Sequence, residues 1–356
     1  MTASDAESMS LRDLLSYATP EDREAFEGLW LGYTETFGAP DLRATIAATY
    51  ANQSADNILC FAGASEGIYA ANSVLLDKDS HAIVVTPNYQ SHETLPQAIC
   101  SATGVPLDAD DDWSLDIDRI KAAIQPNTKL ITINFPHNPT GAILPLDRYM
   151  ALIDLCRHHG IWLLHDEIFN GLGPTGTVHL PFAADVYERG VSLGVTSKSY
   201  GLPGLRIGWI ACQDHDMLSR MERLKHYLSI ANSGPSERLA NIALKNRDAL
   251  LARTCAIVDE NLPKWDAFFG RHSDLFDWQR PDGACMGFPR YKGPEGVEAF
   301  CKTLVEQSGV LFLPSTIYSS ELTDTPQDRF RLGFGRLGLD EGLAALEAHL
   351  QKNDQT

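Results

Sequence analysis

The stretch GVSLGVTSKSYGLPGLRIGWIAC, residues 190–212, decides the fold. Two short apolar runs, at 190–195 and 206–212, enclose a loop that carries Lys198 between two serines. A strand with one face in water alternates apolar and polar residues, whereas a strand buried on both faces is apolar throughout. The pattern therefore predicts two buried strands, with a single lysine directly after the first of them.

Four more runs of this kind precede the stretch, and helix-like segments such as 65–76 and 146–160 lie between them. The runs are NILCFAG (57–63), HAIVVTP (81–87), KLITINFP (129–136) and GIWLLHDE (160–167). Buried strands that alternate with amphipathic helices are typical of a mostly parallel sheet with helices on both faces. We therefore expect an α/β fold.

The chain is expected to divide into a large domain over 33–240 and a smaller α/β domain over 241–356. Helical periodicity from 236 to 272 predicts one long connecting helix. The smaller domain is predicted to contain strands at 283–291, 310–318 and 328–336 and helices at 295–308 and 340–351. Residues 1–32 are polar and acidic, and we expect them to pack on the smaller domain.

Composition narrows the class of ligand. With 29 basic and 47 acidic residues the net charge is −18, which disfavours nucleic acid and anionic membranes as partners. No apolar run approaches the roughly 20 residues of a membrane span, and the opening residues do not resemble a secretory signal, so a cytoplasmic location is expected. The seven cysteines are scattered singly, which indicates neither a metal site nor a disulfide framework. A small-molecule ligand is expected.

Polar residues recur where the predicted strands end, and those ends line the ligand crevice of a parallel sheet. Ala64 and Ser65 begin a helix after the first strand, where free backbone amides suit a phosphate, although Ser65 is equally a plain helix cap. Tyr89 follows the second strand and offers a ring for stacking on a planar ligand, or simply packs. Asn138 presents an amide after the third strand, in a turn that is otherwise ordinary.

The next two strands end in charged groups. Asp166 follows buried residues and so requires a partner, for example a protonated ring nitrogen. Burial lowers the pKa of a lysine, which allows Lys198 to form a Schiff base with an aldehyde, and Arg206 suits a phosphate. Taken singly, a lysine beside a turn is most often a surface charge. Together these groups describe a site for a phosphorylated pyridine aldehyde.

The same motifs, in this order, resemble the class I and II aminotransferases, which are fold type I enzymes that use pyridoxal 5'-phosphate. The motifs are AGASEG (62–67), Tyr89, HNPTG (137–141), DEIF (166–169), Ser197-Lys198 with GLRIGW (204–209), and FRLGFG (330–335). The resemblance covers roughly residues 30 to 350. It implies a large cofactor-binding domain with a smaller C-terminal domain.

The resemblance also implies a role for each residue. Lys198 would form the Schiff base and carry the proton between the substrate Cα and the cofactor, and Asp166 would pair with the pyridine nitrogen. Asn138 would donate to the ring hydroxyl O3′, and Tyr89 would stack on the ring. The phosphate would be held by Ala64, Ser65, Arg206, and either Thr196 or Ser197, with Tyr33 reaching the site of the neighbouring subunit in a homodimer. Arg331 would bind the substrate α-carboxylate.

Three positions depart from the family pattern. Phe169 stands where the family usually has a tyrosine that also bonds O3′. Val195 replaces a hydroxyl residue often found three positions before the lysine. The segment before Tyr33 is short and lacks the glycine-bearing stretch that usually closes over the substrate.

Three functions are therefore open. The first is an aminotransferase that moves the amino group of an L-amino acid to a 2-oxo acid. The second is a lyase or cyclase that uses the same cofactor, because GACMGFPR (283–290), RFRLGFGR (329–336) and Phe169 resemble the capreomycidine synthase branch, which cyclises an arginine derivative. The third is a non-catalytic binding protein, which would have no need for Lys198, Asp166 and Arg331 together. For the substrate side chain, Arg290, Arg329 and Arg336 are candidates or plain surface charges.

The substitution by Phe169 leads to a testable expectation. With only Asn138 left as donor to O3′, the pKa of the Lys198 Schiff base should be higher than in relatives that have the tyrosine. A pH titration of the visible cofactor band measures this pKa. A transition well below neutrality would contradict the expectation.

Overall fold

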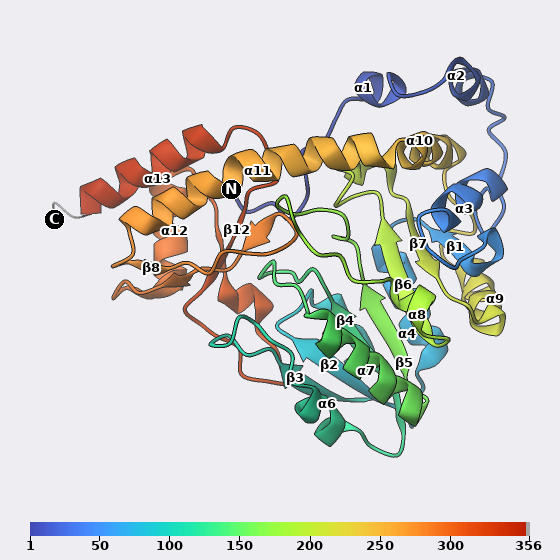
Figure 1. Cartoon of the computed structure of the whole chain (residues 1–356), viewed down its shortest axis with the longest axis horizontal. Helices are drawn as coiled ribbons and strands as arrows, with labels where there is room; N and C mark the ends of the chain where they lie inside the picture. Colours follow the sequence, from blue (N-terminus) through green and yellow to red (C-terminus); the bar gives the residue numbers. More distant parts are fainter. Residues whose placement is uncertain (354–356) are drawn as a thin grey trace.

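The computed structural model describes residues 1–353, and its core is one seven-stranded sheet (Figure 1). The strand order is β1-β7-β6-β5-β4-β2-β3, and β7 alone runs antiparallel to its neighbours. All six apolar runs are strands of this sheet, as the α/β prediction requires. Their bounds are β1 Ile58–Phe61, β2 His81–Thr86, β4 Thr128–Asn134, β5 Trp162–Asp166, β6 Gly190–Val195 and β7 Gly208–Ala211.

The seventh strand, β3 (Ser101–Pro106), was not predicted from the sequence. It lies at the edge of the sheet, where only Val105 among its six residues is buried. An edge strand with little buried surface has no need for a continuous apolar run, so its sequence, SATGVP, carries no strand signal.

Helices cover both faces of the sheet, because alternate strand residues point to opposite sides. Leu163 packs in a cluster with Ile120 of α6 and Leu152 of α7, whereas Leu164 packs with residues of α4 and α9 on the other face. The helices of this part are α3 Pro40–Ala47, α4 Ala64–Leu75, α5 Ser91–Ile99, α6 Ile117–Ala123, α7 Leu146–His159, α8 Ala183–Val186 and α9 His215–Lys225, with short 3₁₀ turns η1 Ala55–Asn57 and η2 Pro203–Leu205.

The long helix expected over 236–272 is two helices, α10 (Gly234–Lys245) and α11 (Arg247–Arg271). The break falls at Asn246, whose backbone leaves the helical region at φ −111° and ψ 24°. Its side chain donates to the carbonyl of Ile242 at 2.8 Å and to that of Tyr17 at 3.3 Å. An asparagine that bonds nearby carbonyls in this way competes with the helical backbone, so apolar periodicity alone could not reveal the break.

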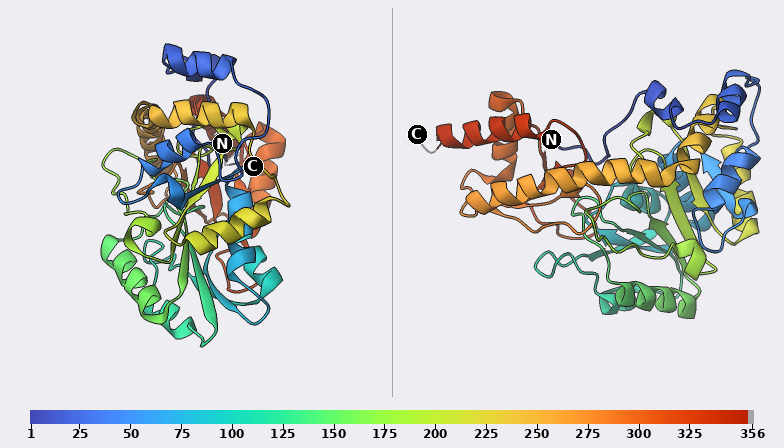
Figure 2. Two further views of the ribbon diagram at one scale, coloured as in Figure 1. Left: turned by 90° about the vertical axis from the view of Figure 1, so that its right-hand side faces the viewer. Right: turned by 45° about the horizontal axis from the view of Figure 1, so that its top comes forward.

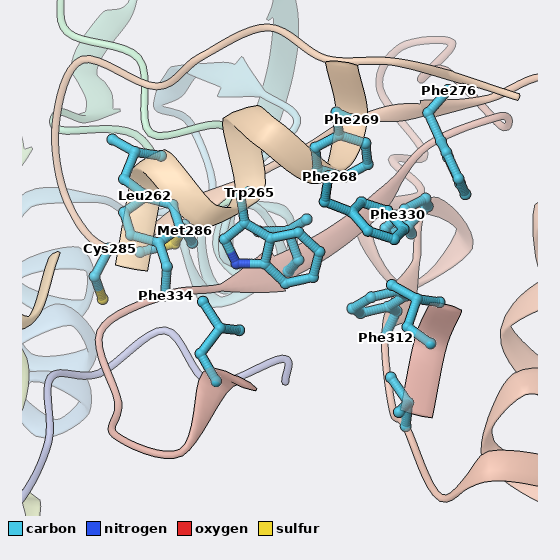
Figure 3. Packing of buried hydrophobic residues seen from close by; sticks show 14 of the residues in the cluster. Leu262, Trp265, Phe268, Phe269, Phe276, Cys285, Met286, Phe312, Phe330 and Phe334 are labelled. Atoms are coloured by element: carbon cyan, nitrogen blue, oxygen red, sulfur yellow. The ribbon is translucent and has the colours of Figure 1, made fainter. Parts of the chain in front are cut away.

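A second group of elements surrounds the far end of α11. It contains β8 Phe276–Asp277, β9 Met286–Gly287, β10 Arg290–Tyr291, α12 Gly296–Ser308, β11 Leu313–Pro314, η3 Ser315–Tyr318, β12 Phe330–Gly333 and α13 Leu339–Asn353. The strands form a three-stranded sheet, β11-β12-β9, and the pair β10-β8. Trp265, Phe268 and Phe269 of α11 pack with Phe312 and Phe330 in an aromatic cluster (Figure 3). The boundaries at 32 and 240 stay a prediction.

The first 32 residues contact two parts of the molecule. Ala6 is fully buried in the cluster of Trp265, and the amide of Gly333 at the end of β12 donates to the carbonyl of Met1. The helices α1 (Leu11–Leu15) and α2 (Pro20–Glu27) instead pack along α10, where Leu14 joins Leu239 in an apolar cluster. Figure 2 shows the N-terminal chain running from β12 past α11 to α10.

Candidate active site

Lys198 lies in the loop after β6, next to Asp166 at the end of β5, so the two groups sit on adjacent parallel strands. The pKa of Lys198 is lowered chiefly by burial and also by the charge of Arg331, against the opposing effect of Asp5, Cys285 and Asp166. Its Nζ donates to Ser4 Oγ at 3.2 Å. A lowered pKa increases the neutral, nucleophilic fraction of the amine.

Asp166 is only 1% exposed, and the structure reveals the partner that the sequence analysis missed. His92 Nε2 lies 2.8 Å from Asp166 Oδ2, and His92 Nδ1 lies 3.1 Å from the hydroxyl of Thr132. When the Thr132 hydroxyl donates to Nδ1, Nε2 carries the proton and donates it to Asp166. His92 is the second residue of α5 and follows Tyr89, a predicted site residue, by three positions. This closeness to Tyr89 was the one signal in the sequence that could have pointed to His92.

Asn138 and Arg331 meet across the two groups of elements. Arg331 Nη1 donates to Asn138 Oδ1 at 3.0 Å, and the phenol of Tyr318 lies 3.5 Å from the same oxygen. Because the amide oxygen faces these donors, the amide nitrogen of Asn138 is directed away from them and is available to a ligand. The Nε of Arg331 is buried and has no hydrogen-bond partner within residues 1–353, so the guanidinium retains donor capacity.

The loop after β1 and the loop before β7 form an anion cradle. Gly63, and not Ser65, is the N-cap of α4, and no side chain caps this helix, so the amides of Ala64 and Ser65 face outward. The guanidinium of Arg206 lies against Gly63, where any Cβ would collide with it. Arg206 itself has φ +52°, a left-handed conformation uncommon for a residue other than glycine and typical of functional sites.

The two hydroxyl candidates for the phosphate differ in the structure. Thr196 is fully buried, and its hydroxyl donates to the carbonyl of Ile207 at 3.1 Å. Ser197 is also buried, but its hydroxyl has no partner in the described part of the chain. A buried unpaired hydroxyl beside an anion cradle fits a bound phosphate, which would supply the missing acceptor. The residues present therefore fit pyridoxal phosphate, with Ser197 favoured over Thr196.

The remaining candidates lie apart from these contacts. Tyr89 is 46% exposed, and its ring lies 6.4 Å from that of His92, near the Asp166 carboxylate. Tyr33 is 84% exposed on the segment before α3. Phe169 is buried with its ring 6.0 Å from Lys198 Nζ, and Val195 is a buried residue of β6.

The three other arginines are already engaged. Arg290 pairs with Asp328, and Arg336 pairs with Asp5. Arg329 lies over the ring of Trp113 and donates to the carbonyl of Phe288 at 3.2 Å. Arg290 and Arg336 are therefore paired with carboxylates, whereas the buried Nε of Arg329 has no hydrogen-bond partner within residues 1–353.

Comparison with known proteins agrees with this geometry. The family model for aminotransferase class I and II matches residues 14–342, and the chain belongs to this family. Members of the family depend on pyridoxal phosphate, which is therefore the cofactor of this site. Across residues 1–353 no group of three or more histidine, cysteine or acidic side chains is arranged to hold a metal ion, and no helix is both long and apolar enough to cross a membrane.

Individual relatives include enzymes of two kinds. Capreomycidine synthase from Streptomyces vinaceus is 31% identical over 88% of this chain and 80% of its own length. A PLP-dependent aminotransferase from Streptococcus suis superposes with a TM-score of 0.91 at 25% identity, covering 99% of this chain and 92% of the other. The PLP-dependent cyclase OrfR superposes with a TM-score of 0.89 at 26% identity, covering 99% and 93%.

The two hydroxyls can be separated by matched variants. Ser197→Ala should weaken pyridoxal phosphate binding about tenfold or more, the effect of losing one hydrogen bond to a charged group, without lowering the free energy of unfolding of the apoprotein. Thr196→Val should lower that free energy by about 1 kcal/mol and leave cofactor affinity nearly unchanged. Equilibrium titration with the cofactor and denaturant unfolding measure the two quantities. The reverse pattern would assign the phosphate contact to Thr196.

Proposed function

We propose that the protein is a pyridoxal-phosphate-dependent aminotransferase that transfers the amino group of an L-amino acid to a 2-oxo acid. The observation that carries this proposal is the position of Lys198. Its pKa is lowered by burial, and its charge interacts with those of Asp166, which contacts His92, and Arg331, which contacts Asn138. A non-catalytic binding protein has no need to keep a desolvated amine that interacts with two such groups.

Each residue has a distinct task in the proposed reaction. Pyridoxal phosphate, when bound, supplies an electron sink for the pair left behind when a bond at the substrate Cα breaks. Arg331 binds the α-carboxylate through its guanidinium, and Asn138 orients that guanidinium through the 3.0 Å contact. Lys198 Nζ accepts the proton from the substrate Cα, because its lowered pKa leaves it neutral more often than an exposed lysine.

Asp166 is held in place by His92, whose Nε2 lies 2.8 Å from Asp166 Oδ2. A carboxylate fixed in this way would pair with the protonated pyridine nitrogen of the cofactor. Ser197, Arg206 and the first amides of α4 would hold the phosphate. The chain's own groups therefore bind, orient and move protons, while the cofactor stabilises charge.

A second candidate is a lyase or cyclase that uses the same cofactor. Two observations favour it: Phe169 stands beside Lys198 where the family usually has a tyrosine, and the similar proteins include a cyclase and capreomycidine synthase. The same removal of the Cα proton by Lys198 can be followed by loss of a substituent on the side chain. The two functions differ in whether the amino group stays on the cofactor.

We also propose that the active form is a homodimer. The exposed apolar side chains around Tyr33 support this, because large exposed patches mark interaction sites. Segment 29–34 lies beside the start of α10, where Thr34 donates to the carbonyl of Asn232 at 3.2 Å. The exposed side chains of this surface are Trp30, Leu31, Tyr33, Tyr227 and Ile230.

The dimer proposal predicts that a substitution in this surface lowers both the dimer fraction and the affinity for the cofactor. Trp30→Asp should shift the protein toward monomer in sedimentation velocity, because a charge in an apolar interface is costly to desolvate. Cofactor affinity should fall in parallel, since Tyr33 would no longer reach the neighbouring site. Val178→Asp, a substitution of another exposed apolar residue outside this surface, is the control and should leave the dimer intact. A wild-type protein that sediments as a monomer with the cofactor bound would contradict the proposal.

A half-reaction assay decides between transamination and elimination. The holoprotein is mixed with single amino acids and no 2-oxo acid, and its absorbance is followed. A transaminase should convert the visible band to the near-ultraviolet band of the aminated cofactor, and a 2-oxo acid should restore it. Elimination or cyclisation returns the original band. Lys198→Ala should abolish either change, and a wild-type protein that never acquires the visible band would rule out both enzymes.

A further inference from the structure

Residues 1–8 form an extended segment, which we call the strap, that crosses the candidate site. The strap is bonded to β12 and to the chain just after it: Gly333 N donates to the Met1 carbonyl at 2.9 Å, and Glu7 N donates to the Gly335 carbonyl at 2.7 Å. Arg253 of α11 donates to the carbonyls of Glu7 and Ser8 at 2.7 and 2.9 Å. A segment with this many fixed contacts has a defined path over the site.

Two glycines provide the space for the strap. A Cβ on Gly333 would collide with the carbonyl oxygen of Ala3, and a Cβ on Gly201 would collide with that of Glu7. Gly201 lies in the loop of Lys198, and Gly333 lies two residues after Arg331. The two loops that carry the reactive amine and the carboxylate-binding arginine are thus both shaped to accept the strap.

The strap occupies the two groups that a substrate would use. Arg331 Nη2 donates to the carbonyl oxygen of Thr2 at 3.0 Å, and Lys198 Nζ donates to Ser4 Oγ at 3.2 Å. A peptide carbonyl on a guanidinium takes the place of one carboxylate oxygen. Because Nη1 donates to Asn138, a bidentate α-carboxylate on Arg331 would use Nε and Nη2, and it therefore competes with the Thr2 carbonyl for Nη2.

We propose that the strap is a built-in competitor of the substrate, and that the α-carboxylate of an amino acid displaces residues 1–4 from Arg331 while residues 5–8 remain attached. This inference rests on the proposed roles of Lys198 and Arg331. Asp5 is the pivot, since both of its carboxylate oxygens accept from Arg336 Nη2, at 2.9 and 2.8 Å. The next residue, Ala6, is fully buried in the apolar cluster of Trp265, so we expect residues from Ala6 onward to stay in place when residues 1–4 are displaced.

The competition can be measured without turnover. 2-Aminoisobutyrate has the amine and the α-carboxylate but no hydrogen on Cα, so its binding to the holoprotein is read from the cofactor absorbance alone. An internal deletion of Thr2–Ser4 should lower its dissociation constant about tenfold, because Arg331 no longer has to exchange one charged hydrogen bond for another. An unchanged or higher dissociation constant would overturn the displacement.

Ser4→Ala is the matched control for the backbone contact. It keeps the Thr2 carbonyl on Arg331 and removes only the hydroxyl at Lys198, so the dissociation constant of 2-aminoisobutyrate should stay within about twofold of wild type. A tightening as large as that of the deletion would place the competition at Lys198 and not at the carboxylate position, and would overturn the proposal.

Hydrogen–deuterium exchange of the holoprotein tests the strap independently of the chemistry. The amides of Ala6 and Glu7 donate to the carbonyls of Lys198 and Gly335, so they should exchange slowly. Asp5→Asn should speed their exchange about tenfold, whereas Asp274→Asn, an exposed substitution elsewhere, should not. If the Ala6 and Glu7 amides of the wild-type holoprotein exchange fast while its cofactor absorbance responds to amino acids, the strap proposal is wrong and the proposed function stands. If these amides are protected but no amino acid changes the cofactor absorbance, the proposed function is wrong, and the strap proposal, which rests on it, is wrong with it.

Discussion

The site depends on the cost of placing opposite charges at the buried ends of two adjacent strands. Asp166 ends β5 and Lys198 follows β6, the neighbouring parallel strand, and both side chains are largely removed from water. Desolvating each group alone would be expensive, so each needs fixed partners. His92 satisfies Asp166 from α5, while Lys198 is left with a lowered pKa and one hydroxyl contact. The two groups therefore differ: Asp166 has a buried hydrogen-bond partner, whereas burial lowers the pKa of Lys198.

The elements around α11 are tied to the same site through several contacts. Arg331 of β12 donates to Asn138. The segment after η3 contacts α5, because Glu321 N donates to Glu93 Oε1 at 2.9 Å. Gln90 of the same region donates to the carbonyl of Ile317 at 3.1 Å. The helix that presents His92 to Asp166 is thus held by residues more than 200 positions away in the sequence.

Much of this arrangement could be predicted from sequence, and the exceptions have a common cause. The six predicted strands are recognisable in the sequence because they are almost entirely buried, the edge strand β1 included, and Lys198, Asp166 and Arg206 lie at strand ends in a recognisable order. β3 escaped because it is an edge strand with one buried residue, and the break at Asn246 escaped because it depends on a side-chain contact with Tyr17. His92 lies only three residues after Tyr89, but its distance to Asp166 became known only from the structure.

The sequence by itself determined the fold class, through the burial pattern of its strands, and the family, through the resemblance of its motifs; it also singled out Lys198 as the candidate Schiff-base lysine. Tertiary structure alone showed that the Ser197 hydroxyl is buried without a partner among the described residues, that His92 contacts Asp166, and that residues 2 and 4 contact Arg331 and Lys198. Those outcomes depend on hydrogen bonds between segments far apart in the chain. Such contacts impose no periodicity on the sequence and become visible only once the chain is folded.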